Sequence, residues 1–226
     1  MANEINYKHM KKLILISLVS FICLQAYSQN FYMPKQYTGR KHRGFYFSGA
    51  WGVNSTNMNV DSKNYGQATY KGTGAVMDLK IGGAITEDLI LHATILVQGM
   101  TGPKINSDYW GINDIKADDK ISISQGLIGG GLTYYTPENI LLSASLGIGG
   151  FTFENEREDL EFSTDNGFSF QLKAGKEWWV SRKLGIGVAV YYQNINVLNQ
   201  KGNEAEETIK SNSFGVVGSL TFNGRK

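Results

Sequence analysis

Eight segments of the chain carry apolar side chains at every second position, with small or polar residues between them. The last segment, residues 214–222, places on one face Phe214, Val216, Gly218, Leu220 and Phe222. Successive side chains of a β-strand point to opposite faces, so such a segment has one apolar face and one small or polar face. The other seven segments lie at residues 44–53, 74–85, 89–97, 121–135, 140–153, 168–177 and 184–193. The pattern predicts an all-β chain of eight antiparallel strands.

Short and long connections alternate between these segments. The short ones lie at residues 86–88, 136–139 and 181–183, and the long ones at residues 54–72, 99–120, 154–167 and 194–212. Alternation of this kind is typical of up-and-down transmembrane β-barrels, which have short periplasmic turns and longer external loops. We therefore expect polar loops outside the cell and tight turns in the periplasm.

The second face of the segments distinguishes a membrane barrel from a soluble sheet. In a soluble β-sandwich or a lipocalin-like barrel the apolar face would be interior, and the outer face would be rich in lysine and glutamate. Here the second face is mostly glycine, alanine and serine, which suits the narrow interior of eight strands. Closure also leaves no unpaired strand edge in hydrocarbon. Residues 43–226 are therefore predicted to form one eight-stranded antiparallel transmembrane barrel.

The N-terminus has the features of a secretory signal peptide. Lysines precede the apolar run 13–24, and the small residues Ala26 and Ser28 stand at positions −3 and −1 of a cleavage site. A membrane-spanning helix needs about 20 apolar residues, which this run does not reach. We predict a signal peptide at residues 1–28, followed by a periplasmic lead-in at residues 29–42.

Removal of this peptide changes what the composition implies. The chain has 22 basic and 20 acidic residues, and residues 1–28 contain three lysines and one glutamate, which leaves 19 of each. A balanced chain does not predict nucleic acid as a partner. The one cysteine, Cys23, lies in the removed segment, so neither a disulfide nor thiol chemistry is expected.

A small set of charged side chains falls on the predicted inner face. Charges buried alone are costly, so we expect opposite signs to pair within the barrel. The favoured interpretation is a structural polar network, and a gated ion path is the alternative. The residues are Asp78, Lys80, His92, Lys173 and Glu177.

Aromatic residues near the strand ends predict belts at the two membrane interfaces, where amphipathic rings prefer to lie. These residues are Trp51, Tyr134, Trp178, Trp179, Tyr192 and Phe222. The acidic segment 154–165 has six carboxylates and one arginine. Its spacing matches no calcium loop, so a solvated loop is favoured over a site for divalent cations or a basic partner.

Four stretches of the chain are informative: Gly44-Phe45-Tyr46-Phe47-Ser48-Gly49, Leu89-Ile90-Leu91-His92-Ala93-Thr94, Gly175-Lys176-Glu177-Trp178-Trp179-Val180, and the terminal Gly218-x-Leu220-x-Phe222. With them, the chain resembles the eight-stranded OmpA/OmpX-like outer-membrane barrel domain of Bacteroidetes-type bacteria. The terminal stretch is similar to the strand that the barrel-assembly machinery recognises. It departs from that pattern because Val216 replaces a polar residue and four residues follow Phe222.

The resemblance implies an integral outer-membrane protein with a structural or surface-interaction role. Its expected partners are outer-membrane lipid, lipopolysaccharide, the assembly machinery and an extracellular partner at the loops. A small passive pore is the first alternative, and a lipid-modifying enzyme is the second. His92 and Thr94 invite comparison with lipid A deacylases, but threonine replaces serine and no orienting carboxylate is identifiable. No catalytic residue, metal or cofactor is therefore predicted.

Overall fold

The computed structural model describes residues 42–109, 111–200 and 206–224. The predicted signal peptide and residues 29–41 of the predicted lead-in lie outside the described residues. Within the described part, no helix is long and apolar enough to cross a membrane.

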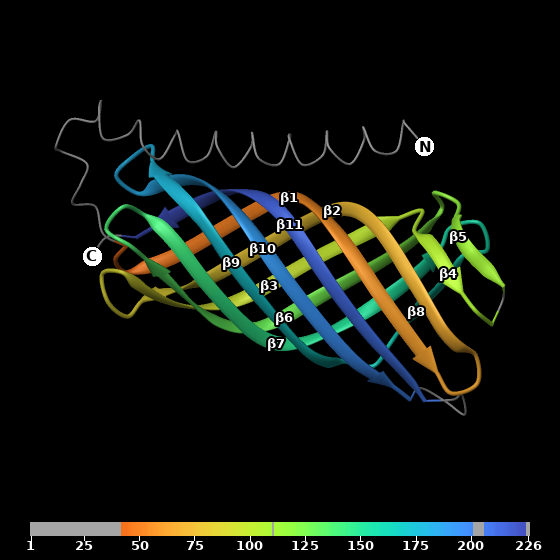
Figure 1. Ribbon diagram of the computed structural model, residues 1–226. Coiled ribbons are helices and arrows are strands. Elements are labelled where there is room, and N and C mark those ends of the chain that lie inside the picture. Colours follow the sequence, from red (N-terminus) through yellow and green to blue (C-terminus); the bar gives the residue numbers. More distant parts are fainter. Residues whose placement is uncertain (1–41, 110, 201–205, 225–226) are drawn as a thin grey trace, which may run out of the picture. The chain divides into compact units, whose positions relative to one another are not determined.

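Eight strands close into an antiparallel barrel, as predicted (Figure 1). They are β1 (Phe45–Ser62), β2 (Gly66–Ala84), β3 (Leu89–Thr101), β6 (Ile121–Tyr135), β7 (Ile140–Asn155), β9 (Gly167–Trp179), β10 (Leu184–Asn199) and β11 (Glu207–Asn223). Their order is β1-β11-β10-β9-β7-β6-β3-β2, and pairing of β2 with β1 completes the circle. There are also three shorter strands, β4 (Lys104–Ser107), β5 (Ile112–Lys116) and β8 (Leu160–Ser163). β4 pairs with β2, β5 pairs with β4, and β8 pairs with β7.

The short connections form one end of the barrel, on the left in Figure 1. In the turn between β6 and β7, Asn139 adopts a left-handed backbone conformation with φ of 59°, which asparagine tolerates better than most residues. The amide of Gly224 donates to the carbonyl of Phe45 over 2.7 Å, so the last strand ends beside the start of the first.

Side-chain orientation follows the predicted alternation. Ile128 is 62% exposed while its neighbour Leu127 is completely buried. On β6 the apolar residues Ile128, Leu132 and Tyr134 all face outward. All eight barrel strands have exposed apolar side chains on the outside, which we call the apolar belt. One example from each strand is Val53, Ile81, Leu91, Ile128, Leu146, Leu172, Val188 and Leu220.

The predicted long loops are largely wrong, because the strands continue through them. β1 and β2 pair without interruption to Ser62 and Gly66. In this part of β1 the pattern is inverted, since Asn59 points outward and Met58 points inward. A strand that leaves the lipid has water outside it, so polar residues take its outer face and apolar residues fill the interior.

Three layers of buried apolar side chains fill the barrel. The layer near the short turns contains Tyr46, Ile90, Tyr135 and Leu141. A middle layer contains Ala50, Val76, Leu96, Leu127, Ala189, Tyr191 and Val217. The layer at the opposite end contains Met58, Met100, Ile123, Phe151, Ile195, Val197 and Ile209. Buried apolar side chains therefore lie near both ends of the barrel and in its middle.

Glycine makes room for the largest inward side chains. A Cβ atom on Gly215 would lie 2.3 Å from the ring of Tyr191, its direct cross-strand partner. A Cβ atom on Gly185 would lie 2.6 Å from Oε1 of Glu177. Interiors packed at this density do not accept a larger residue at either position without rearrangement.

Candidate functional site

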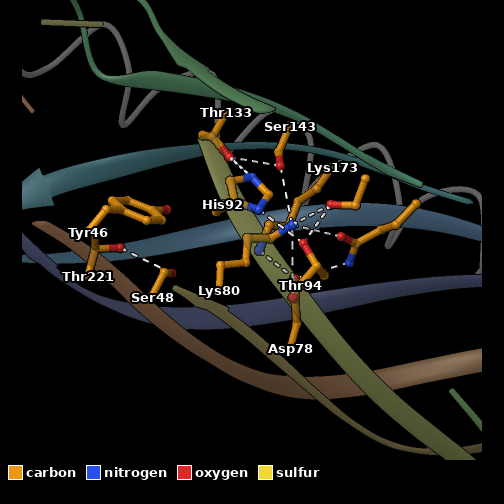
Figure 2. Close-up of polar contacts among 12 residues, drawn as sticks. Tyr46, Ser48, Asp78, Lys80, His92, Thr94, Thr133, Ser143, Lys173 and Thr221 are labelled. Carbon is orange, nitrogen blue, oxygen red and sulfur yellow. Dashed lines mark hydrogen bonds and ion pairs between the residues drawn. The ribbon is translucent and has the colours of Figure 1, made fainter. Parts of the chain in front are cut away.

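A network of buried charged and amide side chains lies inside the barrel, where Asp78, Lys80 and Lys173 point toward one another (Figure 2). Nζ of Lys173 donates to Oδ2 of Asp78 over 2.7 Å, and Nε2 of Gln171 donates to the same oxygen over 3.0 Å. Nζ of Lys80 is 3.9 Å from Oδ1 of Asp78 and donates to Oε1 of Gln171 over 2.9 Å. Asp78 therefore balances one of two buried lysines, and amide and hydroxyl oxygens solvate the other.

His92 joins this network through hydroxyl groups. Its Nδ1 atom is 3.0 Å from Oγ1 of Thr94, and its Nε2 atom is 2.9 Å from Oγ1 of Thr133. Ser143 and Ser145 extend the chain of hydroxyls to Nζ of Lys80, at 3.3 and 3.0 Å. Figure 2 shows His92, Thr133 and Ser143 pointing toward one another. His92 is buried, and none of its hydrogen bonds to described residues goes to a carboxylate.

A second polar cluster closes the end with the short turns. Nε2 of His42 is 3.1 Å from Oε1 of Glu177, and the hydroxyl of Tyr135 donates to Oε2 over 3.3 Å. The hydroxyl of Tyr46 is 3.2 Å from that of Tyr135. Glu177 thus lies with His42 rather than with the lysines. The role of His42 was not predicted, because this residue falls at the end of the predicted periplasmic lead-in, outside the predicted barrel.

The predicted aromatic residues divide into two groups. Outward-facing positions are held by Trp51, Tyr134, Trp178, Tyr192 and Phe222. Tyr192 packs against Phe170 and Phe214, with ring centroids 5.8 and 4.8 Å away. Trp179 differs from the prediction because alternation turns it inward, where its ring centroid lies 5.0 Å from that of His42.

Similarity to solved structures agrees with this architecture. No family model matches the chain, and no curated protein is similar to it in sequence. The crystal structure of Neisserial surface protein A is 14% identical, with a TM-score of 0.51, and the match covers 80% of this chain and 97% of that one. The outer membrane protein OprG from Pseudomonas aeruginosa is 13% identical, with a TM-score of 0.51 and coverage of 83% and 99%. This chain has the fold of a small outer-membrane β-barrel.

In this outer-membrane barrel fold, the strands beyond the apolar belt form a second surface. β10, β11, β1 and β2 continue side by side, and their outward side chains are almost all polar. We call this surface the external polar face. Its outward residues, of which Leu198 alone is apolar, are Ser55, Asn57, Asn59, Asp61, Gln67, Thr69, Lys71, Thr73, Asn194, Asn196, Leu198, Thr208, Lys210 and Asn212.

The acidic segment 154–165 lies at the same end of the barrel as the external polar face. It is a hairpin rather than a loop, because β8 pairs with the end of β7. Arg157 forms an ion pair with Asp118, and the amide of Glu156 donates to the carbonyl of Lys120 over 3.1 Å. The amide of Lys120 and the guanidinium of Arg157 lower the pKa of Asp118. The described residues include no group of three or more histidine, cysteine or acidic side chains able to hold a metal ion.

Proposed function

We propose that this chain is an integral outer-membrane protein that holds a rigid polar sheet outside the cell as a contact surface. One observation carries the proposal: the outward residues of β1 change from apolar, ending at Val53, to polar from Ser55 onward. An apolar exterior requires lipid, and a polar exterior requires water. The paired strands keep their hydrogen bonds across this change, so the outer surface is ordered sheet.

The interior supports a scaffold in preference to a passive pore. Large side chains at both ends of the barrel, such as Tyr135 and Phe151, are almost fully buried. Between them the lysines are held by hydrogen bonds to other side chains. The central network in this proposal stabilises the barrel, because charges in a narrow interior are tolerated when they are paired and hydrogen-bonded.

The proposal includes no catalytic role for His92. Both of its ring nitrogens contact threonine hydroxyls, and the imidazole and its neighbours Thr94 and Thr133 are buried. A nucleophilic hydroxyl needs an activating base that can be oriented, and a route for its substrate. The chain of buried hydroxyls that includes Thr94 and Thr133 is better suited to solvating Lys80.

The proposed partners follow from the exterior. Outer-membrane lipid and lipopolysaccharide would surround the apolar belt, and an extracellular partner would bind the external polar face. Gly218, Leu220 and Phe222 all face outward on β11. In this orientation the barrel-assembly machinery would be able to contact them. This assembly role rests on the sequence resemblance.

Cysteine labelling tests the location and orientation. The one natural cysteine, Cys23, lies in the predicted signal peptide. We expect Asn57→Cys to react with a membrane-impermeant maleimide on intact cells, and Arg182→Cys, in the turn before β10, to react only after the outer membrane is broken. Reaction of both variants on intact cells, or of neither, would contradict the proposed orientation.

Shortening the external hairpin tests the contact role. Replacing residues 55–72 by a two-residue turn removes the parts of β1 and β2 that lie beyond the apolar belt. We expect the variant to keep its heat-modifiable mobility on gels, and cells that carry it to adhere less to mucin-coated glass. Equal adherence would remove the contact role. Stable ion conductance by the unmodified protein in planar bilayers would favour the pore instead.

A further inference from the structure

A polar groove of about 340 Å³ lies on the external polar face. Three neighbouring strands, β11, β1 and β2, supply its outward-facing side chains. They are Asn59, Asp61, Gln67, Thr69, Thr208 and Lys210. The volume lies within the range of small-molecule sites, although the outward side chains of this groove are polar where those of most such sites are apolar.

The pairing of the strands arranges these side chains in two rows. In one row Asp61 is paired with Thr208 on one side and with Gln67 on the other. In the other row Asn59 is paired with Lys210 and with Thr69. Directly paired side chains lie about 5 Å apart, and strands are about 4.8 Å apart, so each row spans roughly 10 Å. A single six-membered sugar ring fits within such a frame.

Most of the hydrogen-bonding capacity in the groove is unused. The hydroxyl of Thr69 donates to Oδ1 of Asn59 over 3.0 Å. Among the described residues, the side chains of Asp61, Gln67, Thr208 and Lys210 form no hydrogen bond with one another or with other side chains. Amide, hydroxyl, carboxylate and ammonium groups therefore present both donors and acceptors to a ligand.

The charge of the groove identifies the class of ligand. Lys210 and Asp61 cancel, so the six side chains together are neutral. A phosphate or sulfate site would need an excess of cations or clustered N–H donors, and an Asp61 carboxylate would repel the anion. An apolar ligand would leave these polar groups unpaired. A neutral molecule with several hydroxyl groups can hydrogen-bond to these polar side chains and brings no negative charge close to Asp61.

Two exposed aromatic rings lie at the tip of this part of the structure. Tyr65, two residues before Gln67, is 51% exposed, and Tyr109, in the connection between β4 and β5, is 58% exposed. Their rings meet edge to face, with centroids 5.4 Å apart. The C–H face of a sugar ring packs on aromatic surfaces, so a chain of sugars leaving the groove would find an apolar contact there.

The position of the groove favours a glycan over a lipid headgroup. Asn59 and Asp61 lie six and eight residues beyond Val53, the last apolar outward residue of β1. At about 3.3 Å per residue, this is roughly 20–26 Å farther along the strand. The lipid headgroups lie next to the apolar belt, whereas extended saccharides reach outward from the surface.

We propose that this groove binds a neutral sugar unit of an extracellular glycan, with Asn59, Asp61 and Gln67 binding its hydroxyl groups. The inference rests on the proposed role as an external contact surface. Asp61 accepts hydrogen bonds from neighbouring hydroxyls, while the amides of Asn59 and Gln67 each donate and accept. Lys210 and the two threonines complete the frame.

Saturation-transfer NMR on the detergent-folded full chain tests the proposal. The probes are maltopentaose, mannopentaose and chitopentaose, with a heparin-derived tetrasaccharide as the anionic comparison. We expect at least one neutral probe to receive saturation, and its affinity to fall at least tenfold in Asn59→Ala and in Asp61→Ala. Asn57→Ala is the matched control, because Asn57 lies outward on the same strand but does not line the groove.

Each outcome decides the proposal. Absence of transfer to all three neutral probes overturns it, as does stronger binding of the anionic tetrasaccharide. An equal loss in Asn57→Ala and Asn59→Ala overturns the assignment to the groove. Sugar binding that is retained while cysteine labelling shows the opposite orientation would remove the proposed contact role and leave the binding site standing.

Discussion

The ring of His42 stacks on the ring of Tyr135, with centroids 3.5 Å apart and an angle of 17° between the planes. The same imidazole contacts the carboxylate of Glu177, and the backbone amide of His42 donates to the carbonyl of Glu87 over 3.0 Å. His42, three residues before β1, is therefore fixed to three other parts of the barrel. This arrangement closes the end that carries the short turns.

Removal of His42 should destabilise the barrel. His42→Ala leaves the buried Glu177 without one of its hydrogen-bonding partners, which typically costs about 1–3 kcal/mol. We expect a lower midpoint in urea unfolding in detergent. In His42→Phe the phenyl ring can still stack on Tyr135, so this variant should recover part of the lost stability. Arg43→Ala is the control, since its exposed side chain forms only a surface ion pair with Glu87. Equal effects of His42→Ala and Arg43→Ala would contradict this interpretation.

The pair formed by Asp78 and Lys173 should show strong energetic coupling. Asp78→Asn leaves two buried lysines without a carboxylate, and breaking a buried pair costs about 3–5 kcal/mol. We expect the double variant Asp78→Asn with Lys173→Met to be more stable than Asp78→Asn alone, in urea unfolding of the refolded barrel. Lys71→Met, on the external polar face, should change stability little. Additive effects of the two central substitutions would show that the pair is not coupled.

Two glycines on β11 should respond differently to the same substitution. Gly215→Val places atoms in the ring of Tyr191, so overpacking should cost about 1–3 kcal/mol and slow refolding in detergent. Gly218→Val should refold normally in detergent, because the nearest atom to a Cβ there is 3.9 Å away. Gel mobility with and without heating measures both. A refolding defect in Gly218→Val that matches that of Gly215→Val would be evidence against this packing.

Tryptophan fluorescence should separate Trp178 from Trp179. In variants that retain one tryptophan each, brominated lipid should quench Trp178 more strongly, because only Trp178 occupies an outward position. Trp179 lies against His42, so its emission should change in His42→Ala while that of Trp178 does not. Equal quenching of the two residues by the lipid would place Trp179 in the aromatic belt after all.

The external hairpins should loosen in acid. The pKa of Asp118 is lowered from 3.8 in the folded protein. The ionised carboxylate therefore stabilises the hairpins above pH 3.8, and this stabilisation is lost as the pH falls through the lower, folded-state pKa. We expect the amide resonance of Lys120, which donates to Oδ1 of Asp118 over 3.0 Å, to titrate below pH 3.8. In Arg157→Ala the midpoint should rise toward 3.8. A midpoint unaffected by this substitution would show that the ion pair is not formed in solution.

Alternation in the sequence was sufficient to predict the strands of the barrel and the direction of most side chains. It placed Asp78, Lys80 and His92 inside because side-chain direction in a strand is a local property of period two. The same rule implied an inward Trp179, yet the expectation of an aromatic belt took precedence over it. The outer halves of β1 and β2 were missed although their alternation continues, because the apolar residues there change face.

The sequence by itself determined the number of barrel strands, their order along the chain and which face of each strand is apolar within the apolar belt. Only the tertiary structure decided which groups meet. His42 and Glu177 are 135 residues apart, and their contact exists because closure brings the residues just before β1 beside the end of β9. The groove likewise needs β11 beside β1, at opposite ends of the barrel sequence. The local pattern of a strand determines in which direction its side chains point. Pairing between strands that are distant in the sequence determines which side chains become neighbours, and both the polar clusters and the groove consist of such neighbours.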